Sequence, residues 1–178
     1  RVRRSVQSCA ELSTLYDPWY AHPEMADPQR AMRVLRLACE QNHAASCAQL
    51  ALFMDPRYPH PGVEDDETHA TLLHERACRA GVGAACTRLG DRHSLEMPWS
   101  QLGQEGAPRL DLSQARDWWE QGCALGDRRG CESLAELYSP TLRGGLGLIE
   151  ASEQQEALCR ARADTVESED CSAGAAGK

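Results

Sequence analysis

Apolar and small residues recur in front of three cysteines with the period of an α-helix. Eight residues before each cysteine stands an alanine, four before stands a bulky residue, and one before stands alanine or glycine. Together with the cysteine, these positions follow one face of an α-helix. The pattern therefore predicts a first helix in each repeated unit, over residues 31–39, 70–78 and 115–123.

A second pattern begins eight residues later, at Cys47, Cys86 and Cys131. Leucine follows each of these cysteines at the third position, a small residue at the fourth and a bulky residue at the seventh. These offsets again trace one helical face. They predict second helices over residues 47–54, 86–93 and 131–138, and the same pattern after Cys9 predicts one over 9–16.

Between the two helices of each unit stands a residue that tolerates the left-handed conformation. Asn42, Gly81 and Gly126 each lie three residues after the first cysteine, where such residue types end helices. The second cysteines follow one another at intervals of 38, 39 and 45 residues. A repeat of this length indicates an α/α solenoid of helix pairs, so we expect an all-α fold.

The periods also predict the domain organisation. We expect a single repeat domain over 1–178, with a partial repeat at 1–27, followed by a C-terminal cap and a short tail. The full repeats, the cap and the tail are expected at about 28–65, 66–111, 112–149, 150–172 and 173–178.

The cysteines predict how each helix pair is held. The stretch ACEQNHAASC places two cysteines where the first helix ends and the second begins. A disulfide there closes a short loop and clamps the pair at its turn, although buried thiols are the alternative. The expected pairs are Cys39–Cys47, Cys78–Cys86, Cys123–Cys131 and, at a spacing of 12, Cys159–Cys171. Cys9 has Arg1 where its partner would stand, so we expect a free thiol, an intermolecular bond or a partner upstream.

These frames, written A-x7-C-x2-G/N-x4-C-x2-L-small, resemble the Sel1-like repeat family over roughly residues 5–165. Within it they resemble the cysteine-rich branch typified by the Helicobacter cysteine-rich proteins. The resemblance implies a right-handed superhelix with a concave inner face and a protein-binding scaffold. It also implies penicillin binding or β-lactamase activity as the alternative function.

Composition excludes several classes of function. The net charge of −8 argues against nucleic acid, no apolar run is long enough to cross a membrane, and the cysteine spacing fits no zinc or haem motif. The only lysine is Lys178, with Ala175 three residues before it, so the S-x-x-K motif of serine β-lactamases is absent. We expect no catalytic residues, no metal and no cofactor, and we interpret His74 as an interior histidine because it occupies the core position of its helix.

Two loops share the pattern DPxYxHP, at Asp17–Pro23 and Asp55–Pro61. We interpret them as rigid turns in which proline fixes the backbone and tyrosine covers the helix ends. The alternative is a pair of ligand or metal sites formed by His22 and His60 with Asp17 and Asp55. The long Ser94–Asp111 loop is a further candidate contact region.

Helical angles predict a partner-binding face. Positions six and two residues before the first cysteine point away from the core. These positions are Arg33, Leu37, Leu72, Arg76, Asp117 and Gln121. We therefore predict a non-enzymatic scaffold that binds another protein or peptide on this face. Its disulfides predict a periplasmic or secreted location. The analogy with the Sel1-like family suggests an adaptor or immunity role. A binder or weak hydrolase of cell-wall or β-lactam ligands is the alternative, and the sequence predicts no oligomeric state.

Overall fold

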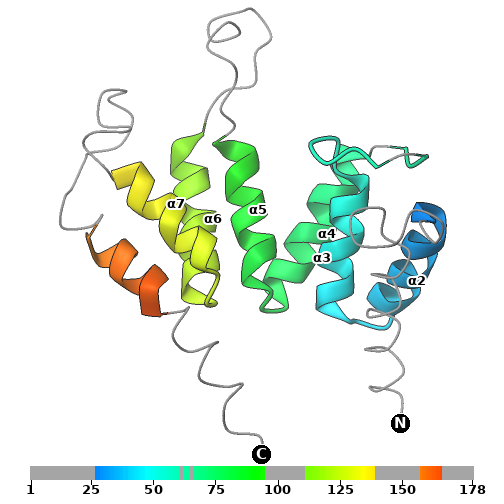
Figure 1. Cartoon of the computed structure of the whole chain (residues 1–178), viewed down its shortest axis with the longest axis horizontal. Helices are drawn as coiled ribbons and strands as arrows, with labels where there is room; N and C mark the ends of the chain where they lie inside the picture. Colours follow the sequence, from blue (N-terminus) through cyan, green and yellow to red (C-terminus); the bar gives the residue numbers. More distant parts are fainter. Residues whose placement is uncertain (1–26, 61, 65, 95–110, 139–156, 166–178) are drawn as a thin grey trace, which may run out of the picture. The chain divides into compact units, whose positions relative to one another are not determined.

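The computed structural model describes residues 27–60, 62–64, 66–94, 111–138 and 157–165, whose regular secondary structure is helical throughout (Figure 1). The chain divides into two compact units, Arg1–Val82 and Gly83–Lys178. Within these described residues, no helix has both the length and the apolar composition needed to cross a bilayer.

The described helices of the first unit are α2 (Pro28–Glu40), α3 (Ala44–Met54) and α4 (Glu67–Arg79). The α3 helix packs against both α2 and α4. The second unit contains α5 (Gly83–His93), α6 (Leu112–Ala124), α7 (Arg128–Tyr138) and a short helix at 157–165, drawn in orange in Figure 1. Here α6 packs against both α5 and α7.

An aspartate caps the first helix of every described repeat. The side chains of Asp27, Asp66 and Asp111 each accept a hydrogen bond of 2.9–3.0 Å from the backbone N–H three residues later. Such caps satisfy N–H groups that lack a partner in the helix and each contribute about 1 kcal/mol. Each aspartate lies 12 residues before the first cysteine, so the cap fixes where the helix begins relative to the disulfide.

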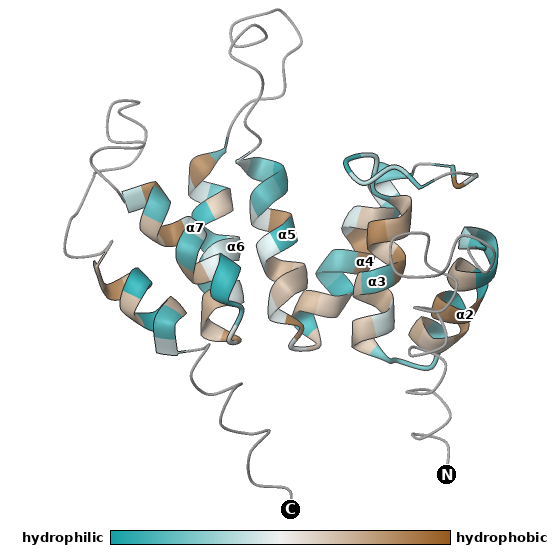
Figure 2. Cartoon of the chain, in the orientation of Figure 1, coloured by the Kyte–Doolittle hydropathy of each residue, from teal (hydrophilic) through white to brown (hydrophobic). Residues whose placement is uncertain are grey.

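The predicted core faces are buried. In α2 the residues that face inward are Ala31, Leu35, Ala38 and Cys39, and the equivalent positions of α4 and α6 are also buried. Apolar and polar residues accordingly alternate around the helices in Figure 2. His74 occupies one of these positions and is 1% exposed, which confirms it as an interior residue.

The turns between paired helices repeat one geometry. Asn42, Gly81 and Gly126 have φ angles of 64°, 92° and 82°, the left-handed conformation predicted for them. The residue after each of these donates its backbone N–H to the carbonyl oxygen five residues before it, at 2.9–3.1 Å. The repeated motif ends one helix and reverses the chain into the next.

The predicted disulfide clamps are present. Cys39 is bonded to Cys47 and Cys123 to Cys131, with S–S distances of 2.06 and 2.01 Å. Cys78 and Cys86 are disulfide-bonded as well.

The expected Cys159–Cys171 bond is wrong for this structure, because Cys159 is a free thiol. A clamp needs a turn directly after its first cysteine, whereas the helix at 157–165 continues through Arg162 at that position. Cys159 instead lies half-buried against the α6–α7 core, which includes Trp119 and Leu134. Cys171 lies outside the described residues.

The bulky position that ends each second helix was predicted less well. Met54 is buried, but the equivalent His93 and Tyr138 are only partly buried. The last helical turn lies at the edge of the core, where a polar group can still reach water. The expected repeat boundaries stay a prediction, and Cys9, Asp17–Pro23 and residues 95–110 lie outside the described residues.

Candidate protein-binding surface

The residues predicted to face a partner are all exposed. Arg33 and Leu37 lie on α2, and Leu72 and Arg76 lie on α4. Leu37 and Leu72 are 57% and 58% exposed, so both leave a large part of an apolar side chain in contact with solvent. The remaining two, Asp117 and Gln121, lie on α6 in the second unit. Each unit thus presents part of the predicted face, and its use in binding stays a prediction.

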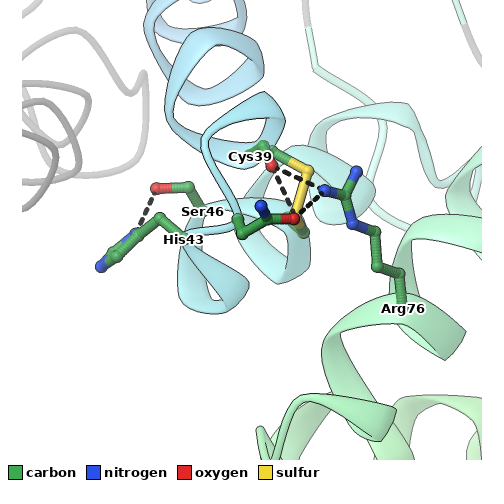
Figure 3. Close-up of a disulfide and its surroundings, with 6 residues drawn as sticks. Cys39, His43, Ser46 and Arg76 are labelled. Carbon is green, nitrogen blue, oxygen red and sulfur yellow. Dashed lines mark hydrogen bonds between the residues drawn. A yellow bond between two sulfur atoms is a disulfide. The ribbon is translucent and has the colours of Figure 1, made fainter.

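Arg76 joins the two helices that bear the leucines. Its Nη2 donates hydrogen bonds to the carbonyl oxygen of Cys39 at 3.0 Å and to Oδ1 of Asn42 at 2.8 Å (Figure 3). Both acceptors belong to the turn that the Cys39–Cys47 disulfide closes. The guanidinium therefore packs the end of α4 against the preceding helix pair, a structural role that the sequence did not reveal.

A cavity of about 220 Å³ lies beside this disulfide. Its lining residues are Asn42, Ala44, Cys47, Arg76, Arg79 and Ala80. Two arginines line the cavity, and Ala44 is the first residue of α3. Arg79 is ion-paired with Glu75, so the contributions that favour an anion are Arg76 and the partial positive charge at the N-terminal end of α3.

Ion pairing differs across the predicted face. Asp117 is exposed but forms an ion pair with Arg116 at 2.7 Å, which makes the Asp117 carboxylate less available to a partner. Arg33 and Arg76 have no carboxylate partner among the described residues. The first unit therefore presents cationic groups beside exposed leucines.

The second DPxYxHP loop is built as a turn. The N–H of Tyr58 donates to the carbonyl of Asp55 at 2.9 Å across Pro56, and the buried Asp55 carboxylate binds the Arg57 guanidinium at 2.7 Å. His60 is buried and stacks on Phe53 with ring centroids 4.3 Å apart. His60 therefore covers Phe53 of α3, a contact that the sequence did not predict, and the expected covering role of the partly buried Tyr58 stays a prediction. The described residues include no group of three or more His, Cys, Asp or Glu that could hold a metal ion.

The second unit contains a partly buried polar network that the sequence did not predict. Asp91 on α5 accepts from Trp119 Nε1 on α6 at 3.1 Å and pairs with Arg129 on α7 at 2.9 Å. Nearby, the Thr87 hydroxyl donates to Asp127 at 2.5 Å. These bonds join three helices, and they satisfy polar groups in a mostly apolar interior.

Cys159 gives a test of the free thiol. Burial raises the pKa of this thiol, and Arg162 opposes the rise only in part. Because the thiolate is the reactive form, we expect iodoacetamide to modify Cys159 more slowly at neutral pH in the folded chain than in the urea-unfolded chain. Peptide-resolved mass spectrometry over a pH series should show that the modification rate is half-maximal at a higher pH than for an ordinary cysteine thiol. Modification of Cys159 only after reduction would instead show that it is oxidised in solution.

No model of a known protein family matches the chain, and no curated protein matches it. Solved structures do match. A Sel1 repeat protein from Oxalobacter formigenes has 20% sequence identity and a TM-score of 0.68, over 90% of this chain and 58% of its own. A protective antigen present in uropathogenic Escherichia coli strains, which displays an SLR fold, has 21% identity and a TM-score of 0.64, over 90% of this chain and 30% of its own. The fold is that of Sel1-like repeats.

An immunity protein from Pseudomonas aeruginosa also has this arrangement, with 12% identity and a TM-score of 0.56 over 93% of this chain and 70% of its own. The Sel1-like fold, all-α with disulfides inside its helix pairs, is therefore confirmed. The chain spans less than two thirds of the length of the first two neighbours. The narrower resemblance to the Helicobacter cysteine-rich proteins stays a prediction.

Proposed function

We propose that this chain is a non-enzymatic scaffold that binds another protein or peptide on the exposed face of its first helices. The observation that supports this most directly is the exposure of Leu37 and Leu72 on neighbouring segments linked by Arg76. Leu72 lies one helical turn before Arg76, and Leu37 lies two residues before Cys39, whose carbonyl Arg76 binds. Exposed apolar groups rimmed by polar ones are typical of protein interfaces.

The disulfides support a location of the protein outside the cytosol. Bonds of this kind persist in the periplasm and outside the cell, whereas cytosolic thiols are kept reduced. An adaptor or immunity role in the envelope or exterior is compatible with the Sel1-like fold, and one neighbour of that fold is described as an immunity protein. Ligand binding or weak hydrolysis of cell-wall or β-lactam compounds has no supporting observation among the described residues.

The test replaces both leucines with glutamine. We expect a partner that is cross-linked to the parent chain in an envelope extract to bind the Leu37→Gln/Leu72→Gln variant at least about tenfold more weakly, because apolar contact in the interface is lost. Quantitative mass spectrometry identifies the partner, and titration with the purified partner gives the dissociation constant.

The matched control replaces Leu125 and Leu158, which are 46% and 59% exposed in the second unit. The Leu125→Gln/Leu158→Gln variant should bind within about twofold of the parent, because surface changes away from an interface have small effects. Equal partner binding by the parent and the Leu37→Gln/Leu72→Gln variant would contradict the proposed face. Turnover of a chromogenic β-lactam that one side-chain replacement abolishes would contradict the non-enzymatic function.

A further inference from the structure

Three arginines on the first unit stand out because nothing described neutralises them. The whole chain has 27 acidic and 19 basic residues, and most guanidiniums with described contacts are ion-paired, for example Arg79 with Glu75. Arg33, Arg36 and Arg76 have no carboxylate partner within the described residues. In an acidic chain, this leaves a local cationic surface on α2 and α4.

Arg76 is held in position by neutral acceptors, so no carboxylate of the described residues offsets its positive charge. A guanidinium has five N–H donors, and the two bonds that Arg76 makes use only Nη2, with neutral acceptors on the Cys39–Cys47 turn. Nη1 and Nε keep their donors for a further group. A side chain that is already ordered loses less entropy when it binds a carboxylate.

The cavity beside Arg76 has room for such a group. Its volume of about 220 Å³ exceeds that of a carboxylate, and Arg76 is the lining guanidinium without a carboxylate partner among the described residues, since Arg79 is paired with Glu75. Arginine binds carboxylates through two parallel hydrogen bonds, and these are stronger than neutral ones. The N-terminus of α3 borders the cavity at Ala44 and adds a positive partial charge.

Apolar side chains flank the cationic groups. Leu37 and Arg33 are one turn apart on α2, and Leu72 and Arg76 are one turn apart on α4. Each helix therefore offers one guanidinium and one exposed leucine on the same stripe. A complementary ligand has acidic groups interspersed with apolar ones.

We propose that the first unit binds an acidic peptide segment of its partner, with a side-chain carboxylate on Arg76 at the cavity and an apolar side chain against Leu37 and Leu72. This inference rests on the proposed function, and it names the chemistry of the partner.

The experiment uses two labelled, end-capped peptides and the intact, oxidised chain. One peptide repeats the triplet glutamate–leucine–aspartate, and the other has glutamine and asparagine in place of the acids. By fluorescence anisotropy at low salt, we expect the acidic peptide to bind at least about tenfold more tightly. The difference should shrink as sodium chloride is added, because salt screens exposed charges.

Variants assign the binding to named residues. Arg33→Gln and Arg76→Gln should each weaken binding of the acidic peptide by about five- to tenfold and leave the neutral peptide unchanged. Arg116→Gln, at a guanidinium already paired with Asp117 in the second unit, should stay within about twofold. Arg33 makes no side-chain hydrogen bond or ion pair with the described residues, so its variant should keep the fold even if Arg76→Gln loosens α4. Circular dichroism checks both variants.

Equal binding of the two peptides, binding of neither, or parent-like affinity in Arg76→Gln would each overturn the acidic-segment proposal. Competition separates this outcome from failure of the scaffold itself. If the cross-linked partner depends on Leu37 and Leu72 but the acidic peptide does not displace it, only the proposal about partner chemistry fails. If the leucine variant binds the partner as the parent does, the proposed face fails as well.

Discussion

Replacing Gly90 with alanine is expected to lower the free energy of unfolding by about 2 kcal/mol, although alanine normally favours a helix over glycine by about 1 kcal/mol. A Cβ atom at this position would lie 2.5 Å from Cδ1 and 2.6 Å from Nε1 of Trp119. The indole is 2% exposed and donates to Asp91, so it can move only by breaking that bond and the packing around it. Urea denaturation followed by circular dichroism measures the change.

A double-mutant cycle supplies the control for this prediction. In a Trp119→Leu background the ring is gone, and the same Gly90→Ala change should be neutral or stabilising by up to about 1 kcal/mol. Trp119→Leu itself should be destabilising, because it leaves a cavity in the core. If Gly90→Ala stabilises the parent chain, the close contact between α5 and α6 is not present in solution.

Replacing both members of the Cys39–Cys47 pair with alanine is expected to lower the free energy of unfolding by about 2.5 kcal/mol. This is the chain-entropy value for a closed loop of about nine residues. Three such pairs amount to about 8 kcal/mol, within the range of about 5–15 kcal/mol for the whole stability of a domain. Adding a reductant should therefore shift the urea midpoint of the parent far more than that of a variant lacking all three pairs.

Cys159→Ala is the matched control, because this cysteine is a free thiol. It should change stability by about 0.5 kcal/mol or less, in keeping with a half-buried site. Non-reducing peptide mapping should recover each clamp as a bond across eight residues. Cross-links between different repeats, or a urea midpoint that reductant does not move, would contradict the clamps.

The helix pairs could be predicted because their signals are local and occur three times. Alanine eight residues before the cysteine, the residue with positive φ three after it and the leucine three after the second cysteine all depend on helical geometry within one unit. The structure places them as expected, at Ala31, Asn42 and Leu50, for example. The capping aspartates are equally regular in the sequence, 12 residues before each first cysteine, and could have predicted where these helices begin.

The binding surface could be predicted only in part, because contacts between residues far apart in the sequence depend on the tertiary structure. Helical angles correctly put Arg76 on the outer face, but they could not show that its guanidinium reaches the Cys39 carbonyl 37 residues away. Replacing Arg76 with glutamate should therefore weaken the packing of α4 against the Cys39–Cys47 turn, since a carboxylate cannot donate to that carbonyl. Arg33, with no such bond, remains the cleaner position for testing charge.

The aspartate cap and the two clamp cysteines form a segment of constant length. The interval from cap to second cysteine is 20 residues in each described repeat, from Asp27 to Cys47, from Asp66 to Cys86 and from Asp111 to Cys131. By contrast, the interval from a second cysteine to the next cap is 19 residues in one case and 25 in the other. Evolution can therefore lengthen, shorten or duplicate the chain at these junctions without changing the register of any sulfur, and a protein engineer can graft foreign loops there for the same reason.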